Sequence, residues 1–164
     1  TINMEILSNG TLFIMIILMF IGASPGSTGG GIKTTTAAVL LSTARAWLKG
    51  KERPELYERS IPNDLVQKSL AIVFISQLII VVIAFALFMT EKAPFVNILF
   101  EVVSAFGTVG LSTGLTPDLS GSGKLLITLM MYIGRIGPLT MALAVGQRMV
   151  KIHYYYPEER VMIG

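Results

Sequence analysis

The stretch SLAIVFISQLIIVVIAFALFM, Ser69–Met89, runs for 21 residues without a charged side chain. A helix of that length crosses a hydrocarbon core of about 30 Å, so the stretch predicts a transmembrane helix. The composition agrees, because 52% of the residues are hydrophobic and only 14% are charged, whereas soluble domains carry about 25% charged residues. We therefore expect an all-α integral membrane protein.

Two further apolar stretches, one on each side of the first, are interrupted. Leu12–Ala23 breaks at Ser24–Lys33 before a helical pattern resumes over Ala37–Trp47. Leu125–Gln147 is long enough to cross a membrane but contains the run Gly134–Pro138, GRIGP. A core helix of a soluble protein could resemble one such stretch, but three together argue against that alternative. The sequence predicts broken membrane helices on both sides of a continuous one.

A shorter apolar segment, Pro94–Phe106, is followed by the glycine-containing run Gly107–Gly114, GTVGLSTG. A helix of about 12 residues rises about 18 Å, which is half of a bilayer. Pro94 suits a first helical turn, and the glycines end the helix. The segment that contains this half-helix either crosses the membrane or enters it and returns to the same side.

The distribution of basic residues favours re-entry. Six lysines and arginines lie in Arg45–Lys68, and the C-terminal tail adds Arg148, Lys151 and Arg160, whereas Thr90–Lys124 holds two. The positive-inside rule then assigns the linker and the tail to the cytoplasm. Two cytoplasmic ends need an even number of crossings, so the half-helix must re-enter from the outer side. The predicted unit is membrane helix, pore half-helix, membrane helix, with a re-entrant filter loop.

A faint internal repeat supports this unit. Met19–Gly22, MFIG, matches Met131–Gly134, MYIG, and each ends an apolar run that leads into a breaker.

Because Thr1 is neither Met nor followed by a basic leader, we expect the chain to start inside a longer polypeptide. Four parts are predicted: a broken transmembrane helix with an intramembrane gating loop (1–48), a cytoplasmic linker (49–64), a complete repeat (65–150) and a cytoplasmic tail (151–164).

The end of the half-helix is the candidate ion filter. Its C-terminal carbonyls carry the negative end of the helix dipole into the membrane, and an extended segment after it would offer backbone carbonyls that are tolerated there only beside a cavity or inside protein. Both suit a dehydrated monovalent cation, and Gly110 adds conformational freedom. A plain re-entrant turn that conducts nothing is the alternative. The candidate filter residues are Gly107, Thr108, Val109, Gly110 and Leu111.

The run Gly26–Thr36, GSTGGGIKTTT, invites comparison with a phosphate-binding loop, but its spacing does not fit. Ile32 separates Gly31 from Lys33, and an apolar helix-like run precedes it instead of a strand. Four glycines in six residues do not hold a helix well, so we expect an unwound segment in mid-membrane, either a kink or a movable gate. The candidate gate residues are Gly26, Ser27, Thr28, Gly29, Gly30, Gly31, Lys33 and Arg135.

Three charged residues fall within these membrane segments. Arg135 lies about ten residues into a span, where a charge costs about 2.5–3.5 kcal/mol on insertion scales, and it should face protein or water. Lys33 either takes part in the gate or extends toward the cytoplasmic interface. Glu101 on the half-helix either orients the filter by hydrogen bonds or faces a vestibule.

Several classes of function are disfavoured. The chain has no cysteine and a single histidine, His153, which leaves no zinc site and no Ser-His-Asp triad. A net charge of +3 gives no argument for nucleic acid.

Three motifs together resemble a known family. The stretches Phe20–Thr36, Phe100–Gly114 and Tyr132–Pro138 resemble the intramembrane loop, the fourth pore helix with its filter, and the last pore-lining helix of KtrB-type potassium-uptake subunits of the Trk/Ktr/HKT superfamily. The resemblance implies four repeats around one pore, of which this chain would hold the second membrane helix of repeat three and all of repeat four. Gly110 would be the filter glycine of repeat four, and Arg135 would lie beneath the filter beside the loop.

The resemblance also implies the partners and the ion. K⁺ would bind the backbone carbonyls of Thr108, Val109 and Gly110, with Na⁺ as an activator and no organic cofactor. The protein would form a homodimer in the cell membrane, in contact with lipid, with the tail to Gly164 near the dimer contact. A KtrA-like cytoplasmic ring that binds nucleotides would regulate it. The alternatives are a non-conducting helical assembly subunit and a membrane NTPase that uses the glycine-rich loop.

Overall fold

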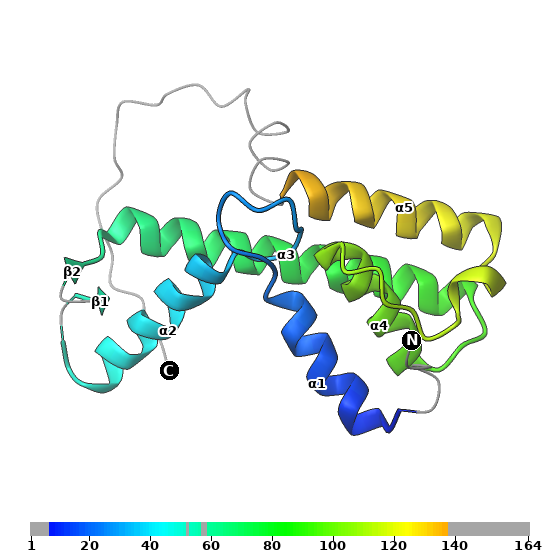
Figure 1. The fold of residues 1–164 in the computed structure, drawn as a ribbon, viewed down its shortest axis with the longest axis horizontal. Helices are drawn as coiled ribbons and strands as arrows, with labels where there is room; N and C mark the ends of the chain where they lie inside the picture. Colours follow the sequence, from blue (N-terminus) through cyan, green and yellow to red (C-terminus); the bar gives the residue numbers. More distant parts are fainter. Residues whose placement is uncertain (1–6, 52, 57–58, 138–164) are drawn as a thin grey trace, which may run out of the picture.

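A computed structural model describes residues 7–51, 53–56 and 59–137. Within these residues the chain is mostly helical, and Figure 1 shows its helices in sequence colours. The elements follow in the order α1 (Asn9–Phe20), α2 (Thr34–Leu48), β1 (Glu55–Leu56), β2 (Arg59–Ser60), α3 (Asn63–Thr90), α4 (Phe95–Gly107), the 3-10 turn η2 (Thr116–Asp118) and α5 (Gly121–Ile136).

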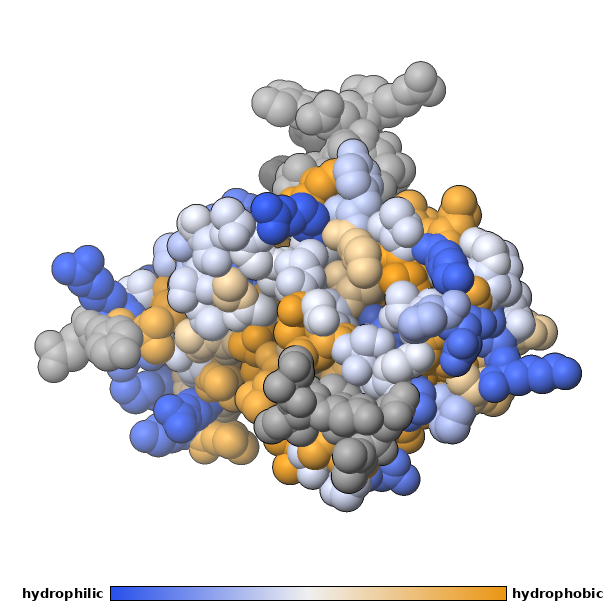
Figure 2. Space-filling model, turned by 45° about the vertical axis from the view of Figure 1, so that its right-hand side comes forward, coloured by the Kyte–Doolittle hydropathy of each residue, from blue (hydrophilic) through white to orange (hydrophobic). Residues whose placement is uncertain are grey.

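Helix α3 is the continuous membrane helix that the sequence predicts. It has 28 residues, and it is the one helix in the described part of the chain that is long and apolar enough to cross a membrane. Phe74 and Phe85 point outward with 71% and 62% of their surface exposed. Large apolar side chains on an outer face are typical of contact with lipid. On the face drawn in Figure 2, hydrophilic residues gather toward the left and right ends and hydrophobic ones lie between them.

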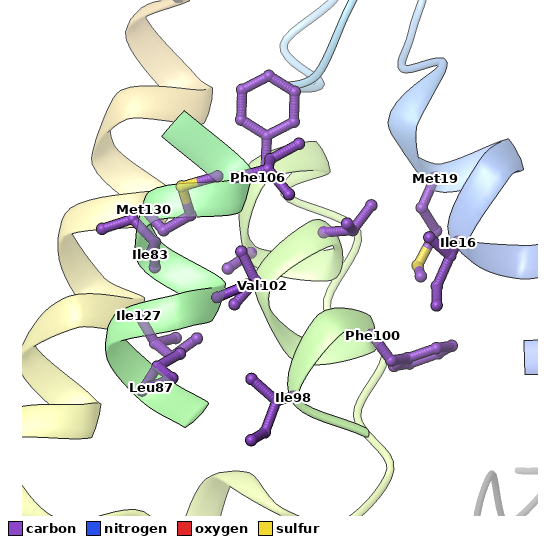
Figure 3. Packing of buried hydrophobic residues seen from close by; sticks show 14 of the residues in the cluster. Ile16, Met19, Ile83, Leu87, Ile98, Phe100, Val102, Phe106, Ile127 and Met130 are labelled. Atoms are coloured by element: carbon purple, nitrogen blue, oxygen red, sulfur yellow. The ribbon is translucent and has the colours of Figure 1, made fainter. Parts of the chain in front are cut away.

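Helix α4 is the predicted half-helix, and it lies at the centre of the fold. It packs against α1, α3 and α5, and every residue from Phe100 to Gly107 is buried. Its 13 residues rise about 20 Å, too little to cross a bilayer. Figure 3 shows buried residues of α1, α3, α4 and α5 that pack together: Ile16, Met19, Ile83, Leu87, Ile98, Phe100, Val102, Phe106, Ile127 and Met130.

Two glycines allow the backbones to approach at the C-terminal end of α4. A Cβ added to Gly134 of α5 would lie 2.0 Å from the carbonyl oxygen of Phe106, and one added to Gly107 would lie 2.7 Å from that of Met19. Small residues at such crossings are the usual device by which membrane helices pack closely. Helices α1 and α5 therefore approach α4 closely through glycine.

The carboxylate of Glu91 ties the end of α3 to the start of α5. It accepts hydrogen bonds from the hydroxyl of Ser120 and, at 3.2 Å, from the backbone N–H of the same residue. The Ser120 hydroxyl bond holds the pKa of Glu91 below its usual value. Helices α3 and α5 run in opposite directions (Figure 1), with α4 joined between them.

Some expectations need correction. The linker contains a small antiparallel hairpin, β1 and β2, which an all-helical prediction omits. Helix α3 begins at Asn63, and the division of the chain into four parts stays a prediction. Helix α1 ends two residues before Gly22, whereas α5 continues two residues past the matched Gly134, so the two breaks differ in position. Positions 138–150 of the predicted repeat and the predicted tail 151–164 lie outside the described residues.

Candidate functional site

The segment after α4, which the sequence predicts to be extended, turns instead. Thr108 adopts the left-handed conformation (φ 52°, ψ 38°) and closes the helix. Its N–H donates to the carbonyl of Ala105 at 3.1 Å, and the N–H of Val109 donates to the carbonyl of Ser104 at 3.0 Å. Gly110 has φ +81°, a region that favours glycine. The chain therefore turns sharply at both Thr108 and Gly110.

Three backbone carbonyls in this turn are free to act as ligands. In the described part of the chain, no group donates a hydrogen bond to the carbonyl oxygen of Thr108, Val109 or Gly110. The carbonyl of Phe106, two residues before Thr108, accepts from Gly31 N at 3.1 Å. The carbonyl of Leu111, just after them, accepts from Ser104 Oγ at 2.6 Å. Leu111 belongs to the predicted filter, but its carbonyl already has a partner.

The predicted filter segment lines two cavities. Thr108, Gly110 and Leu111 line one of about 840 Å³, together with Glu101 and Arg135 among others. Val109, Gly107 and Leu111 line a second of about 390 Å³ between α4 and α1. Backbone carbonyls without protein partners thus lie beside space that water or an ion could occupy.

The loop between α1 and α2 is the unwound segment that the sequence predicts. Its two ends are held side by side, because Gly22 N donates to Ile32 O at 2.7 Å and Ile32 N donates to Phe20 O at 3.2 Å. Gly26 and Gly31 have positive φ angles of 81° and 76°. The residues from Gly22 to Gly31 therefore leave the helix path and return to it as a closed loop.

The loop contacts the end of α4 directly. Gly30 N donates to Thr108 Oγ1 at 2.7 Å, next to the bond from Gly31 to Phe106. A Cβ on Gly30 would lie within 3 Å of the Phe106 carbonyl, the Thr108 side chain and the Gly134 carbonyl. The loop thus fills the space between α4 and α5, beside the end of α5 (Figure 1).

Two cationic side chains, those of Lys33 and Arg135, donate hydrogen bonds to the backbone of the loop. Lys33 Nζ donates to Gly29 O at 2.7 Å and to Ser27 O at 3.2 Å. Arg135, from α5, donates to the carbonyl of Thr28. Three successive loop carbonyls, those of Ser27, Thr28 and Gly29, are therefore held by charged donors. The structure brings the predicted gate residues into one cluster that contacts Thr108 of the predicted filter.

Two polar residues of α4 bind the segment that follows it: Glu101, for which the sequence leaves hydrogen bonding or a vestibule open, and Ser104, which the sequence does not single out. Glu101 is 5% exposed and accepts hydrogen bonds from Ser112, Thr113 and Thr116. Ser104 binds the carbonyl of Leu111. Their spacing of three residues on a mostly apolar helix was the available signal, because it places both on one face.

Comparison with known proteins agrees with the membrane architecture. The chain matches the TrkH family, described as a cation transport protein, over residues 1–151. It is 46% identical to the Ktr system potassium uptake protein D of Bacillus subtilis, with 100% of this chain and 36% of that protein aligned.

Two other relatives are equally informative. Identity is 44% to the Ktr system potassium uptake protein B of Bacillus subtilis (94% of this chain, 35% of the relative) and 44% to the potassium/sodium uptake protein NtpJ of Enterococcus hirae (96% and 36%). The chain spans about a third of the length of these relatives. The family description names transport and no enzymatic reaction. This chain is a membrane protein that belongs to the TrkH family of cation transport proteins.

Proposed function

We propose that this chain forms part of the K⁺ path of a potassium uptake protein, with Thr108–Gly110 as a selectivity filter. The observation that carries the proposal is a set of three neighbouring carbonyl oxygens, at the end of a buried half-helix, that accept no hydrogen bond from the residues that the structure describes. Carbonyl dipoles that replace a hydration shell are the known design for conducting K⁺. The names of the relatives, potassium uptake proteins, point to the same ion.

The loop from Gly26 to Lys33 acts as the gate in this proposal. It touches the filter at Thr108 and is held by two cationic side chains. Arg135 and Lys33 would keep the loop across the ion path and would also repel cations. Movement of the loop away from α4 would open the path.

The rest of the assembly follows the family pattern. The chain would supply the second membrane helix of repeat three and all of repeat four, in a homodimer of the cell membrane with a cytoplasmic linker and tail. A nucleotide-binding KtrA-like ring would control the loop, consistent with the Ktr system names of two relatives. Na⁺ would act as an activator, and the name of NtpJ includes sodium.

Substitution of Gly110 tests the filter. In the full-length protein, Gly110→Ser should weaken the preference for K⁺ over Na⁺ by about tenfold, because a Cβ at φ +81° costs about 1–2 kcal/mol and moves the adjacent carbonyls. The measurement is K⁺ uptake with Na⁺ competition in cells that lack their own K⁺ uptake. Gly50→Ser is the matched control, since Gly50 also has a positive φ and open space around it but lies in the linker. Equal K⁺ preference in both variants would exclude Gly110 from the filter.

Substitution of Arg135 tests the gate. Arg135→Ala removes one of three bonds between a cation and a loop carbonyl, so the K⁺ uptake rate should rise, by about two- to fivefold if part of the hydrogen-bond energy holds the closed state. Lys124→Ala is the control, because Lys124 lies on the same helix and donates to a carbonyl outside the loop, that of Pro117 at 2.9 Å. A lower rate for Arg135→Ala, at equal membrane levels, would assign the arginine to conduction instead of closure.

A further inference from the structure

Glu101 is a carboxylate buried in the middle of a membrane protein. It lies on α4, where the neighbouring residues from Phe100 to Gly107 are also buried, and only 5% of its surface is exposed. Ionisable groups at such depth are costly and are usually functional. None of the lysines and arginines in the described ranges forms an ion pair with it. Its hydrogen-bond partners are uncharged groups.

Those partners all lie in the segment that follows the filter. Oε1 accepts from Ser112 Oγ at 2.5 Å, from Thr113 N at 2.9 Å and from Thr113 Oγ1 at 3.3 Å. Oε2 accepts from Thr116 Oγ1 at 2.8 Å. Both carboxylate oxygens are therefore occupied by donors from a single short stretch of chain.

Ser104 continues this set of contacts toward the filter. It lies one turn after Glu101 on the same face of α4, and its hydroxyl donates to the carbonyl of Leu111 at 2.6 Å. The two side chains together bind Leu111, Ser112, Thr113 and Thr116. We call residues 111–116 the return limb. The polar face of α4 holds the return limb over its whole length.

Within the described residues, α4 holds the C-terminal side of the filter only through the return limb, by the hydrogen bonds of Ser104 and Glu101. On the N-terminal side, Thr108 and Val109 are fixed by bonds to the last turn of α4. Between these two anchors Gly110 is exposed, and no atom lies within 4 Å of where its Cβ would be. The directions of the free carbonyls then depend on how firmly the limb is held.

We propose that Glu101 is a positioning residue that sets the discrimination between K⁺ and Na⁺ by holding the return limb against α4. The proposal rests on the proposed K⁺ path. Its physical basis is preorganisation, because the smaller Na⁺ is excluded only if the carbonyls cannot close around it. Glu101 also lines the cavity shared with Thr108 and Gly110, so a direct attraction of its charge for cations is the competing explanation.

Removing hydroxyl donors from the limb tests positioning without changing any charge. In the full-length protein, Ser112→Ala with Thr116→Val should lower the ratio of K⁺ to Na⁺ affinity by about tenfold, because two hydrogen bonds to a carboxylate are lost. Thr128→Val is the matched control, since its hydroxyl donates only within α5, to Lys124 O at 2.8 Å. If the double variant does not reach the membrane, Thr116→Val alone keeps the side-chain shape, and a smaller drop in the same direction is expected.

Glu101→Gln separates positioning from charge. Glutamine keeps one acceptor oxygen for Ser112 and Thr113, and its NH₂ group can donate to Thr116, whose hydroxyl also accepts. Positioning therefore predicts that Glu101→Gln keeps a higher ratio of K⁺ to Na⁺ affinity than the Ser112/Thr116 double variant. The inference is overturned if Glu101→Gln weakens the affinity for both ions equally while the double variant matches wild type.

The outcome also distinguishes this inference from the proposed function. If Gly110→Ser lowers the ratio but the limb variants do not, the filter stands and the role of Glu101 falls. If the wild-type protein takes up no K⁺, the proposed function itself fails.

Discussion

Deletion of Gly26, Ser27 and Thr28 from the full-length protein should raise K⁺ uptake about tenfold or more and reduce its dependence on a regulatory partner. The deletion removes the carbonyls of Ser27 and Thr28 that bind Lys33 and Arg135. It leaves the hydrogen bond from Gly22 N to Ile32 O at the base of the loop. Hydrogen bonds to charged groups contribute about 1.5–3 kcal/mol, and each 1.4 kcal/mol shifts a closed–open equilibrium tenfold.

A length-preserving variant is the control for this deletion. Ser27→Ala with Thr28→Ala keeps both carbonyls, so it should raise uptake far less than the deletion does. Combining the deletion with Arg135→Ala should give less than the product of the two single effects, because both changes remove the same contact. If the deletion leaves the uptake rate of a folded, membrane-inserted protein unchanged, or abolishes uptake, the loop is a scaffold and not a gate.

Gly134→Ala should abolish K⁺ uptake and lower the thermal stability of the purified full-length protein. The new Cβ would lie 2.0 Å from the carbonyl oxygen of Phe106 and within 3 Å of two further backbone atoms of that residue. A backbone cannot yield as a flexible side chain does, so α5 must move away from α4 at the filter. Overpacking of this kind costs about 1–3 kcal/mol and sometimes more.

The control for Gly134→Ala lies on the same helix. An added Cβ on Gly121, at the start of α5, meets no atom within 4 Å, and alanine favours helix over glycine. Gly121→Ala should therefore leave uptake and the unfolding temperature in detergent close to wild type. If Gly134→Ala keeps wild-type stability and uptake, the close approach of α4 to α5 is needed for neither property.

The helices were predictable because their patterns are local. A charge-free run gives α3, and four glycines in six residues break the helix between α1 and α2. The length of the apolar run before Gly107 limits α4 to half of a bilayer. Each of these features depends on a few neighbouring residues, so the sequence states them directly.

The details of the site were not predictable because they depend on distant contacts. Thr108 takes a left-handed conformation that threonine rarely adopts, and its hydroxyl accepts from Gly30, 78 residues away in the chain. Glu101 could face protein or a vestibule, and only the fold of the return limb decides between them. The hairpin β1–β2 is two residues per strand, too short to leave a periodic pattern.

The location of ions in the full-length protein tests the central claim most directly. Crystals of that protein grown in Rb⁺ or Tl⁺, which replace K⁺ and scatter anomalously, would show where the ion binds. We expect anomalous density within coordination distance of the carbonyl oxygens of Thr108, Val109 and Gly110. Ion density elsewhere along the protein, with none at these three carbonyls, would contradict the account.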